Sequence, residues 1–160
     1  MIKSVKDDRY DVECVCTHGG NVKVKADFVV DKLSDIKDLH TFKRIFVDEL
    51  HFFVDAVEVI QKLVLTTECH IFTTSLNGTS ADENGKRTPF ECVTQLLPYT
   101  SEMHIIKAVC FTCRADTLLT ETTAFGKEQH KLGIYVGGLG MYEAKCIKCI
   151  NAAKPDFWFG

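Results

Sequence analysis

Four cysteines in the C-terminal half of the chain have a spacing that suits a metal ion. Cys110 and Cys113 form one C-x2-C pair, and Cys146 and Cys149 form a second pair after residues 114–145. Each pair can direct two thiolates at one ion from a tight turn, and four thiolates fill every position of a tetrahedral zinc site. Such a site leaves no position open for a substrate, so the pattern predicts a structural metal.

Two disulfides, four unrelated core thiols or an iron–sulfur cluster are the other interpretations of these cysteines. The duplicated spacing and the lack of a signal-type segment near Met1 favour zinc, because thiols in reducing compartments more often hold metal than form disulfides. The other cysteines lack ligand spacing and are expected to be core or surface thiols: Cys14, Cys16, Cys69 and Cys92. The histidines form no H-x3–5-H pair, and we expect ordinary surface or half-buried residues at His18, His40, His70, His104 and His130.

A second candidate group is the carboxylate pair Asp48 and Glu49, which follows the apolar run 45–47. At the end of a strand, an Asp can hold Mg²⁺, usually through water, and a neighbouring Glu can take a proton from an attacking hydroxyl. The same pair could instead only complement the dipole of a following helix. Taken alone, the pair leaves both interpretations open.

The segments around these residues alternate between strand and helix patterns. The apolar run 45–47, within 41–49, predicts a buried parallel strand. A helix is expected to follow from near Phe52, with one apolar face made of Phe53, Ala56, Val57, Ile60 and Val64. Further along we expect a strand over 69–76, a polar loop over 80–88, a short helix that Pro98 ends (Phe90, Val93, Leu96 and Leu97) and a strand over 104–109. Parallel strands need crossover helices, so this order predicts an α/β domain with a parallel sheet.

Composition excludes several classes of protein. The chain has 160 residues, 46% hydrophobic and 26% charged, which is typical of a globular domain rather than a disordered chain. A net charge of −3 argues against a nucleic-acid partner. No window approaches the roughly 18 uninterrupted apolar residues of a membrane span. We therefore expect no membrane partner and a cytoplasmic protein.

Several segments together resemble the type II thymidine kinases, the zinc-containing cellular family shared with poxviruses. They are IFVDELHFF (45–53), SLNGT (75–79), KRTPFECV (86–93), AVCFTC (108–113), VGG with MY (136–142) and CIKC (146–149), preceded by KDDRY (6–10) and CTH (16–18). The resemblance extends to about Ile150 and implies a P-loop or RecA-like parallel sheet, N-terminally truncated, followed by a zinc-binding lasso. The expected domains are an α/β kinase domain over 1–109, the lasso over 110–150 and a tail over 151–160.

The resemblance implies transfer of phosphate from ATP, with Mg²⁺, to the 5′-hydroxyl of thymidine or deoxyuridine, in nucleoside salvage for DNA synthesis, by a homo-oligomer that is a tetramer in the family. Glu49 matches the general base, Asp48 the Walker-B-type carboxylate, and Asp7 with Arg9 a pair near the reacting phosphate. The implied nucleoside-binding residues are Phe52, Leu76 and Phe90 as an apolar wall, and Thr120, Tyr135 and Tyr142 from the lasso.

The chain also departs from the family pattern. Leu50 stands where the family usually has a small residue, and His51 stands where Gln is commoner. Ser80 takes the place of a pocket Phe, and Thr122 that of a common Arg. Extra polar residues also lie in 80–88. The sequence contains no G-x4-G-K-S/T motif, whose backbone N–H groups and lysine hold the β- and γ-phosphates. We therefore expect this polypeptide alone to bind ATP weakly and to phosphorylate thymidine slowly, as a fragment of a longer enzyme or a degenerate paralogue. The alternative function is a catalytically inactive zinc-stabilised binding or subunit-association module.

Overall fold

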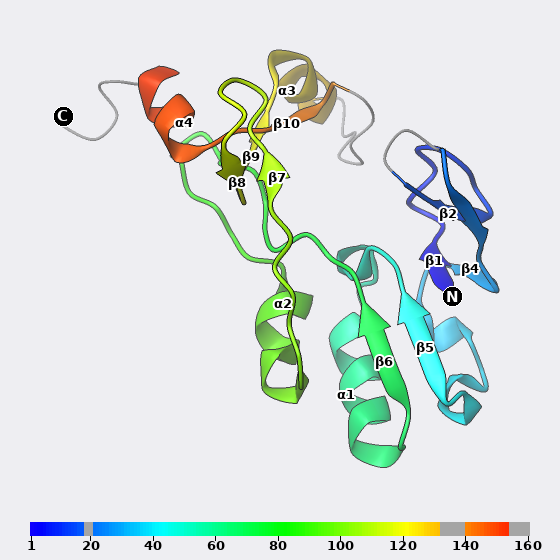
Figure 1. The fold of residues 1–160 in the computed structure, drawn as a ribbon. Coiled ribbons are helices and arrows are strands. Elements are labelled where there is room, and N and C mark those ends of the chain that lie inside the picture. The colour runs from blue at the N-terminus through cyan, green and yellow to red at the C-terminus, as the bar shows by residue number, and fades with distance from the viewer. Residues whose placement is uncertain (18–20, 132–139, 154–160) are drawn as a thin grey trace. The chain divides into compact units, whose positions relative to one another are not determined.

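The computed structural model describes residues 1–17, 21–131 and 140–153, which fall into two compact units (Figure 1). The first unit comprises Met1–Gly78 and Pro89–Ser101, and the second comprises Thr79–Thr88 and Glu102–Gly160. Within the described ranges, no helix is both long enough and apolar enough to cross a membrane. Two residues named above, His18 and Tyr135, lie outside these ranges.

A four-stranded parallel sheet forms the centre of the first unit, in the order β4-β1-β5-β6 (Figure 1). The strands are β1 (Ile2–Ser4), β4 (Phe28–Val30), β5 (Arg44–Val47) and β6 (His70–Thr73). Because all four strands run in one direction, the segments after their carboxyl ends meet at one edge, where open α/β sheets bind ligands. The predicted α/β class with a parallel sheet is confirmed, and its P-loop or RecA-like identity stays a prediction.

Two helices bury one face of this sheet. Helix α1 (Ala56–Thr66) contributes Ala56, Ile60 and Leu63, and the shorter α2 (Glu91–Leu96) contributes Cys92 and Leu96. These side chains form one core with residues of β1 and β5, namely Ile2, Ile45 and Val47. The predicted helices are thus present, but α1 begins at Ala56 rather than near Phe52, and Leu63 rather than Val64 lies on its buried side.

The strand expected to be buried in 41–49 is present as β5, but it is buried on one face only. Ile45 and Val47 are buried, whereas Phe46 points to the other face, is 41% exposed and stacks on Phe72 with ring centroids 4.8 Å apart. Among the described residues, the helices of the core cover only the Ile45 face, because the side chains of a strand alternate between its two sides.

Short elements complete the first unit. A hairpin pairs β2 (Cys14–Cys16) with β3 (Lys23–Lys25), and single 3-10 turns are η1 (Leu33–Asp35), η2 (Leu39–Thr41), η3 (Leu50–Phe52) and η4 (Leu97–Tyr99). The Asp55 carboxylate accepts the backbone N–H groups of Leu33 and Ser34 at 3.1 and 2.9 Å. This side chain therefore fixes the start of η1 against the start of α1.

The second unit contains two small antiparallel ladders. β7 (Ala108–Val109) pairs with β8 (Asp116–Thr117), and β9 (Thr120–Thr122) pairs with β10 (Tyr142–Ala144). Its helices are α3 (Ala124–Lys131) and α4 (Ile147–Ala153). The predicted strand over 104–109 is wrong beyond β7, which joins no parallel sheet. Ile105 and Ile106, whose apolar side chains carried that prediction, are 66% and 88% exposed.

Candidate functional site

The carboxylate pair lies at the carboxyl edge of the sheet, directly after β5. Glu49 has φ 49° and ψ 53°, a left-handed conformation that is uncommon outside glycine. Thr74, the first residue after β6, holds this turn, because its hydroxyl accepts the Glu49 N–H at 3.1 Å and donates to Asp48 Oδ1 at 2.6 Å. Its carbonyl also accepts the Leu50 N–H at 2.8 Å. Neighbouring strands thus fix the backbone of both carboxylates.

Arg9 joins Glu49 to the segment that follows β1. Its Nη2 donates to Glu49 Oε1 at 2.7 Å, and its Nε donates to Asp7 Oδ1. The other oxygen of Asp7 accepts from Lys3 Nζ at 3.0 Å, and the side chains of Lys3 and Asp7 are almost fully buried. Burial alone would raise the pKa of Asp7, but hydrogen bonds from Arg9 and Lys3 hold it below its ordinary value. Asp7 therefore stays ionised and fixes Arg9 beside Glu49.

His51 lies on the other side of Glu49, in η3. Its Nδ1 is 3.5 Å from Glu49 Oε2 and 3.4 Å from the Leu76 backbone nitrogen. The buried ring stacks on Phe90 at 4.7 Å and lies 4.5 Å from the Phe52 ring, centroid to centroid. Burial lowers the pKa of His51, and the charge of Glu49 opposes this shift only in part. A neutral imidazole can accept the Leu76 N–H at Nδ1.

The three predicted wall residues gather around this imidazole. Phe52 and Phe90 contact it with their rings, and Leu76 contacts it through its backbone, while the Leu76 side chain is 52% exposed. The structure thus brings the wall residues within reach of Glu49, through His51. Their contact with a nucleoside stays a prediction.

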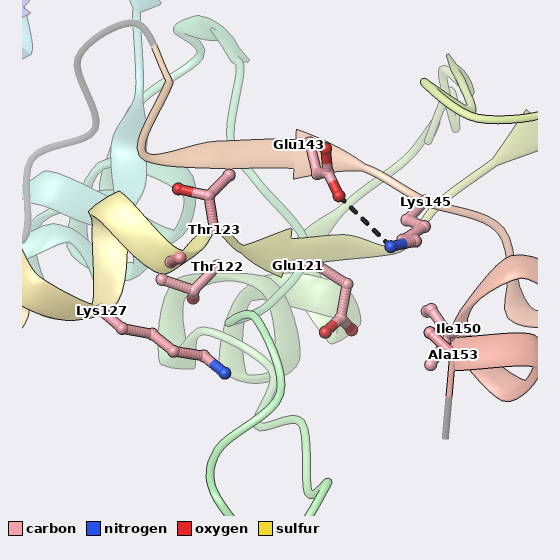
Figure 2. Close-up of a pocket in the computed structure, with 9 residues that line it drawn as sticks. Glu121, Thr122, Thr123, Lys127, Glu143, Lys145, Ile150 and Ala153 are labelled. Carbon is pink, nitrogen blue, oxygen red and sulfur yellow. Dashed lines mark hydrogen bonds and ion pairs between the residues drawn. The ribbon is translucent and has the colours of Figure 1, made fainter. Parts of the chain in front are cut away.

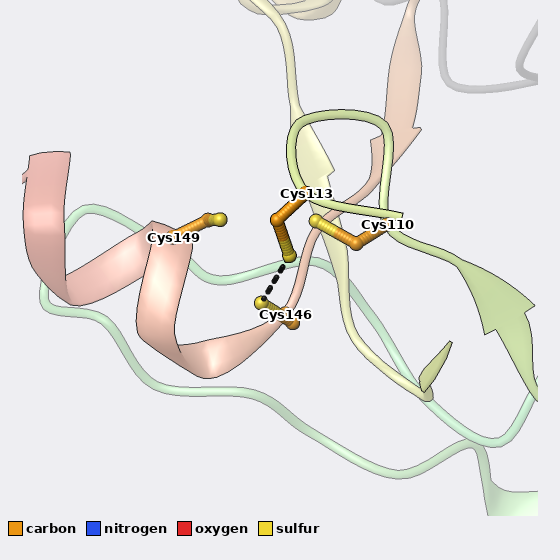
Figure 3. Close-up of side chains that lie close together, drawn as sticks. All are labelled: Cys110, Cys113, Cys146 and Cys149. Carbon is orange, nitrogen blue, oxygen red and sulfur yellow. Dashed lines mark hydrogen bonds between the residues drawn. The ribbon is translucent and has the colours of Figure 1, made fainter. Parts of the chain in front are cut away.

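The four predicted metal ligands converge in the second unit (Figure 3). Their Sγ atoms all lie within 4.8 Å of one another, and Cys113 and Cys146 are 3.5 Å apart. Cys110 follows β7, and the turn after it is closed by the Arg114 N–H, which donates to the Cys110 carbonyl at 3.0 Å. Cys146 directly precedes α4, and Cys149 lies in its first turn.

This donor set fits a single tetrahedral ion. Bonds of about 2.3 Å at tetrahedral angles place sulfurs about 3.8 Å apart, close to the separations seen here. All eight cysteines are free thiols, so the disulfide interpretation does not describe this structure. The Cys113 backbone N–H lowers the pKa of Cys110 to about 6, and the Cys149 backbone N–H lowers that of Cys146. Metal ligation needs thiolates, which these hydrogen bonds favour at Cys110 and Cys146, whereas the neighbouring Cys113 thiol raises the pKa of Cys149 to about 12.

Two of the predicted lasso residues lie on paired strands. Tyr142 on β10 stands opposite Thr122, and Thr120 on β9 stands opposite Ala144. The Tyr142 hydroxyl and His130 Nε2 are hydrogen-bonded at 2.7 Å. Tyr135, the third of these residues, lies outside the described ranges.

A hollow of about 230 Å³ opens between the two strands and the helices that flank them (Figure 2). It is lined by Glu121, Thr122, Thr123, Ala124, Lys127, Glu143, Lys145, Ile150 and Ala153. Thr120 and Tyr142, the two predicted lasso contacts within the described ranges, do not line it. Its lysine and glutamate side chains partly neutralise one another, since Lys145 Nζ lies 3.4 Å from Glu143 Oε1.

Residues 1–150 match the family model described as thymidine kinase. The chain belongs to the thymidine kinase family. A curated relative named "Thymidine kinase", from Pseudothermotoga lettingae, is 34% identical over 161 residues, covering 98% of this chain and 81% of the relative. The resemblance drawn from short segments is therefore confirmed.

Three residues of this thymidine kinase family member have contacts that its sequence does not predict: Thr74, His51 and Arg87. Thr74 was predicted only as part of a strand, although a hydroxyl at the end of a neighbouring strand is a usable signal. The sequence marks His51 only as a departure from the family pattern, because nothing in it shows that the ring contacts both Phe52 and Phe90. Arg87 lies in a polar stretch, and its partners Thr120 and Glu121 are more than 30 residues away in the sequence.

Proposed function

We propose that this chain transfers the γ-phosphate of ATP to the 5′-hydroxyl of thymidine or deoxyuridine, with Glu49 as the general base. The observation that supports this most is the Arg9–Glu49 pair at the carboxyl edge of a parallel sheet, in a chain of the thymidine kinase family. Glu49 is fixed there by its backbone and by the bond from Arg9 to Oε1, and Oε2, which lies 3.5 Å from His51 Nδ1, is the oxygen proposed to take the proton.

Each of the residues Glu49, Arg9 and Asp48 is proposed to have a different role in phosphate transfer. The 5′-oxygen forms a bond to the γ-phosphorus while the bond from that phosphorus to ADP breaks, and Glu49 takes the hydroxyl proton. Arg9, held by Asp7, places a positive charge beside the reacting group. Asp48 is the residue that would hold Mg²⁺ through water, and a bound Mg²⁺ would neutralise charge on the ATP phosphates.

The nucleoside contacts come from the resemblance. In the first unit, Phe52, Leu76 and Phe90 are proposed to form an apolar wall for the base, which the contacts of both aromatic rings with His51, Phe90 stacked and Phe52 tilted, support. In the second unit, Thr120 and Tyr142 are proposed to hold the nucleoside by polar contacts. A cytoplasmic homo-oligomer remains the expectation for the assembly.

We propose zinc as the ion of the tetrathiolate cluster. Four sulfurs leave it no open position, so its role is structural. Holding both ends of residues 114–145 at one point lowers the entropy cost of ordering the segment between them. The metal would therefore help residues 114–145 to fold over a substrate and would take no part in the chemistry.

Glu49→Gln tests the proposed base, with Glu58→Gln on the exposed side of α1 as the matched control. Calorimetry should show thymidine binding to the natural full chain and to both variants with similar affinity. Transfer of label from radioactive ATP should fall by about 10²–10⁴-fold in Glu49→Gln alone. Absence of thymidine binding in a folded, metal-loaded natural chain would reject the proposed function and favour the non-catalytic module.

A further inference from the structure

The polar segment 79–88 is an ordered loop of the second unit rather than a loose insertion. Its ends are joined by two hydrogen bonds, from the Thr79 N–H to the Thr88 carbonyl at 2.9 Å and from the Thr88 N–H to Thr79 Oγ1 at 3.1 Å. At its tip, Asp82 Oδ1 accepts the N–H groups of Asn84 and Lys86 at 2.9 and 2.8 Å. The loop is therefore held in shape by hydrogen bonds among its own residues.

This loop contacts strand β9 through its side chains. Arg87 Nη1 donates to the Thr120 carbonyl at 2.5 Å, and Arg87 Nη2 donates to Glu121 Oε1. The Ser80 and Thr122 hydroxyls are hydrogen-bonded at 2.6 Å. Every residue of the three-residue strand therefore has a partner in the loop. The Arg87 and Glu121 side chains are largely shielded from water, which strengthens their charge-assisted bond.

The opposite side of β9 is held by the part of the unit that carries the cysteines. β10 pairs with β9 residue by residue, from Tyr142 opposite Thr122 to Ala144 opposite Thr120. The Ala144 carbonyl also accepts the Phe111 N–H at 2.8 Å, within the first cysteine pair. β9 thus has two sets of partners, strand β10, which is bonded to the cysteine cluster, and the 79–88 loop.

We propose that the 79–88 loop is a clamp for β9, and that Arg87 is a positioning residue for the proposed nucleoside contact at Thr120. The part that concerns the nucleoside rests on the function proposed above. The two sequence departures at Ser80 and Thr122 meet in this clamp, so a polar pair stands where the family pattern has an aromatic and a basic residue. Arg87 acts through the strand and takes no part in the chemistry.

The geometry of the Arg87 guanidinium can be tested by substitution. Its planar fork bonds a carbonyl and a carboxylate at once, whereas lysine offers a single charged point that can serve only one of them well. Lys86 is the matched control, because it is the neighbouring basic residue, is exposed and has no side-chain partner among the described residues. Arg87→Gln, Arg87→Lys and Lys86→Gln therefore form a graded set.

The test measures substrate kinetics and hydrogen exchange in the natural full chain. Arg87→Gln should raise the KM for thymidine about tenfold, the loss expected for charge-assisted hydrogen bonds, and leave kcat within about twofold. Arg87→Lys should give an intermediate KM, and Lys86→Gln no change. Amides of 119–123 should exchange faster in Arg87→Gln, while amides of 110–113 and the bound zinc content stay as in the parent.

Each other outcome has a defined meaning. Unchanged exchange over 119–123 in Arg87→Gln would overturn the clamp. Faster exchange throughout the second unit, or loss of the metal, would show a general structural role and overturn positioning. If the parent binds no thymidine but 119–123 still loses protection, the clamp stands and the proposed function fails. A changed kcat with an unchanged KM would contradict the assignment of Arg87 to nucleoside positioning.

Discussion

Arg9 Nη2 lies 2.7 Å from Glu49 Oε1 and so joins the segments after β1 and β5 across the carboxyl edge of the sheet. The same guanidinium bonds Asp7, which is buried and also bonded to Lys3. The orientation of Glu49 therefore depends on a chain of ionic hydrogen bonds that begins inside β1. Changes at Arg9 should therefore act mainly on activity, and changes at Asp7 also on stability.

Arg9→Lys should lower kcat about 10²-fold, because a lysine lacks the planar fork that fixes Asp7 and Glu49 at once, and a displacement of about 1 Å at a reacting group can cost that much. Steady-state kinetics should show a thymidine KM close to that of the parent. Arg44→Lys, an exposed change at the start of β5, is the control and should behave as the parent. A lower kcat in both variants would contradict a specific role for Arg9.

Asp7→Asn should reduce the free energy of unfolding by about 3–5 kcal/mol, since removal of one partner leaves the buried Lys3 ammonium without its counter-ion. Asp8→Asn changes the exposed neighbour and should cost less than about 0.5 kcal/mol. Urea unfolding followed by circular dichroism compares the two. Equal stabilities would show that the Lys3–Asp7 pair does not hold β1 in place.

The sequence predicted the features that depend on local pattern and missed those that depend on long-range contacts. The β5 strand with Asp48 and Glu49 at its end follows from an apolar run and two charges, and the cysteine pairs follow from their spacing. Thr74 and Arg87 gain their partners only after folding, because these lie 25 or more residues away. Ile105 and Ile106 misled the prediction, since apolar residues indicate a strand only where something covers them.

The stability of the first unit should depend on pH through His51. Its pKa in the folded state lies below the ordinary value of 6.5, mainly because the ring is buried. The unfolded chain therefore binds more protons below about pH 6.5, and stability should fall as the pH falls through that value toward the folded pKa. The charged groups that act on the ring are Glu49, Arg9, Asp48 and Asp7.

His51→Gln should flatten this dependence, whereas His40→Gln, an exposed change in η2, should retain it. Hydrogen exchange of β5 and β6 amides between pH 7.5 and 5 is the measurement, because it reports on the first unit alone. A slope that is the same in the parent and His51→Gln would mean that another group titrates in this window.

Removal of the metal should destabilise the second unit and leave the sheet of the first unit protected. Metal analysis of the purified chain should find one zinc, and Cys149→Ser should lose it, because three thiolates bind less tightly than four. Cys16→Ser, in the β2–β3 hairpin, is the control and should keep its zinc. After chelation, amides of 110–123 and 141–150 should exchange rapidly while those of β5 do not, since binding free energy at a structural zinc site is also folding free energy. Retention of zinc in Cys149→Ser, or full protection of those amides after chelation, would contradict a tetrathiolate site that holds the unit together.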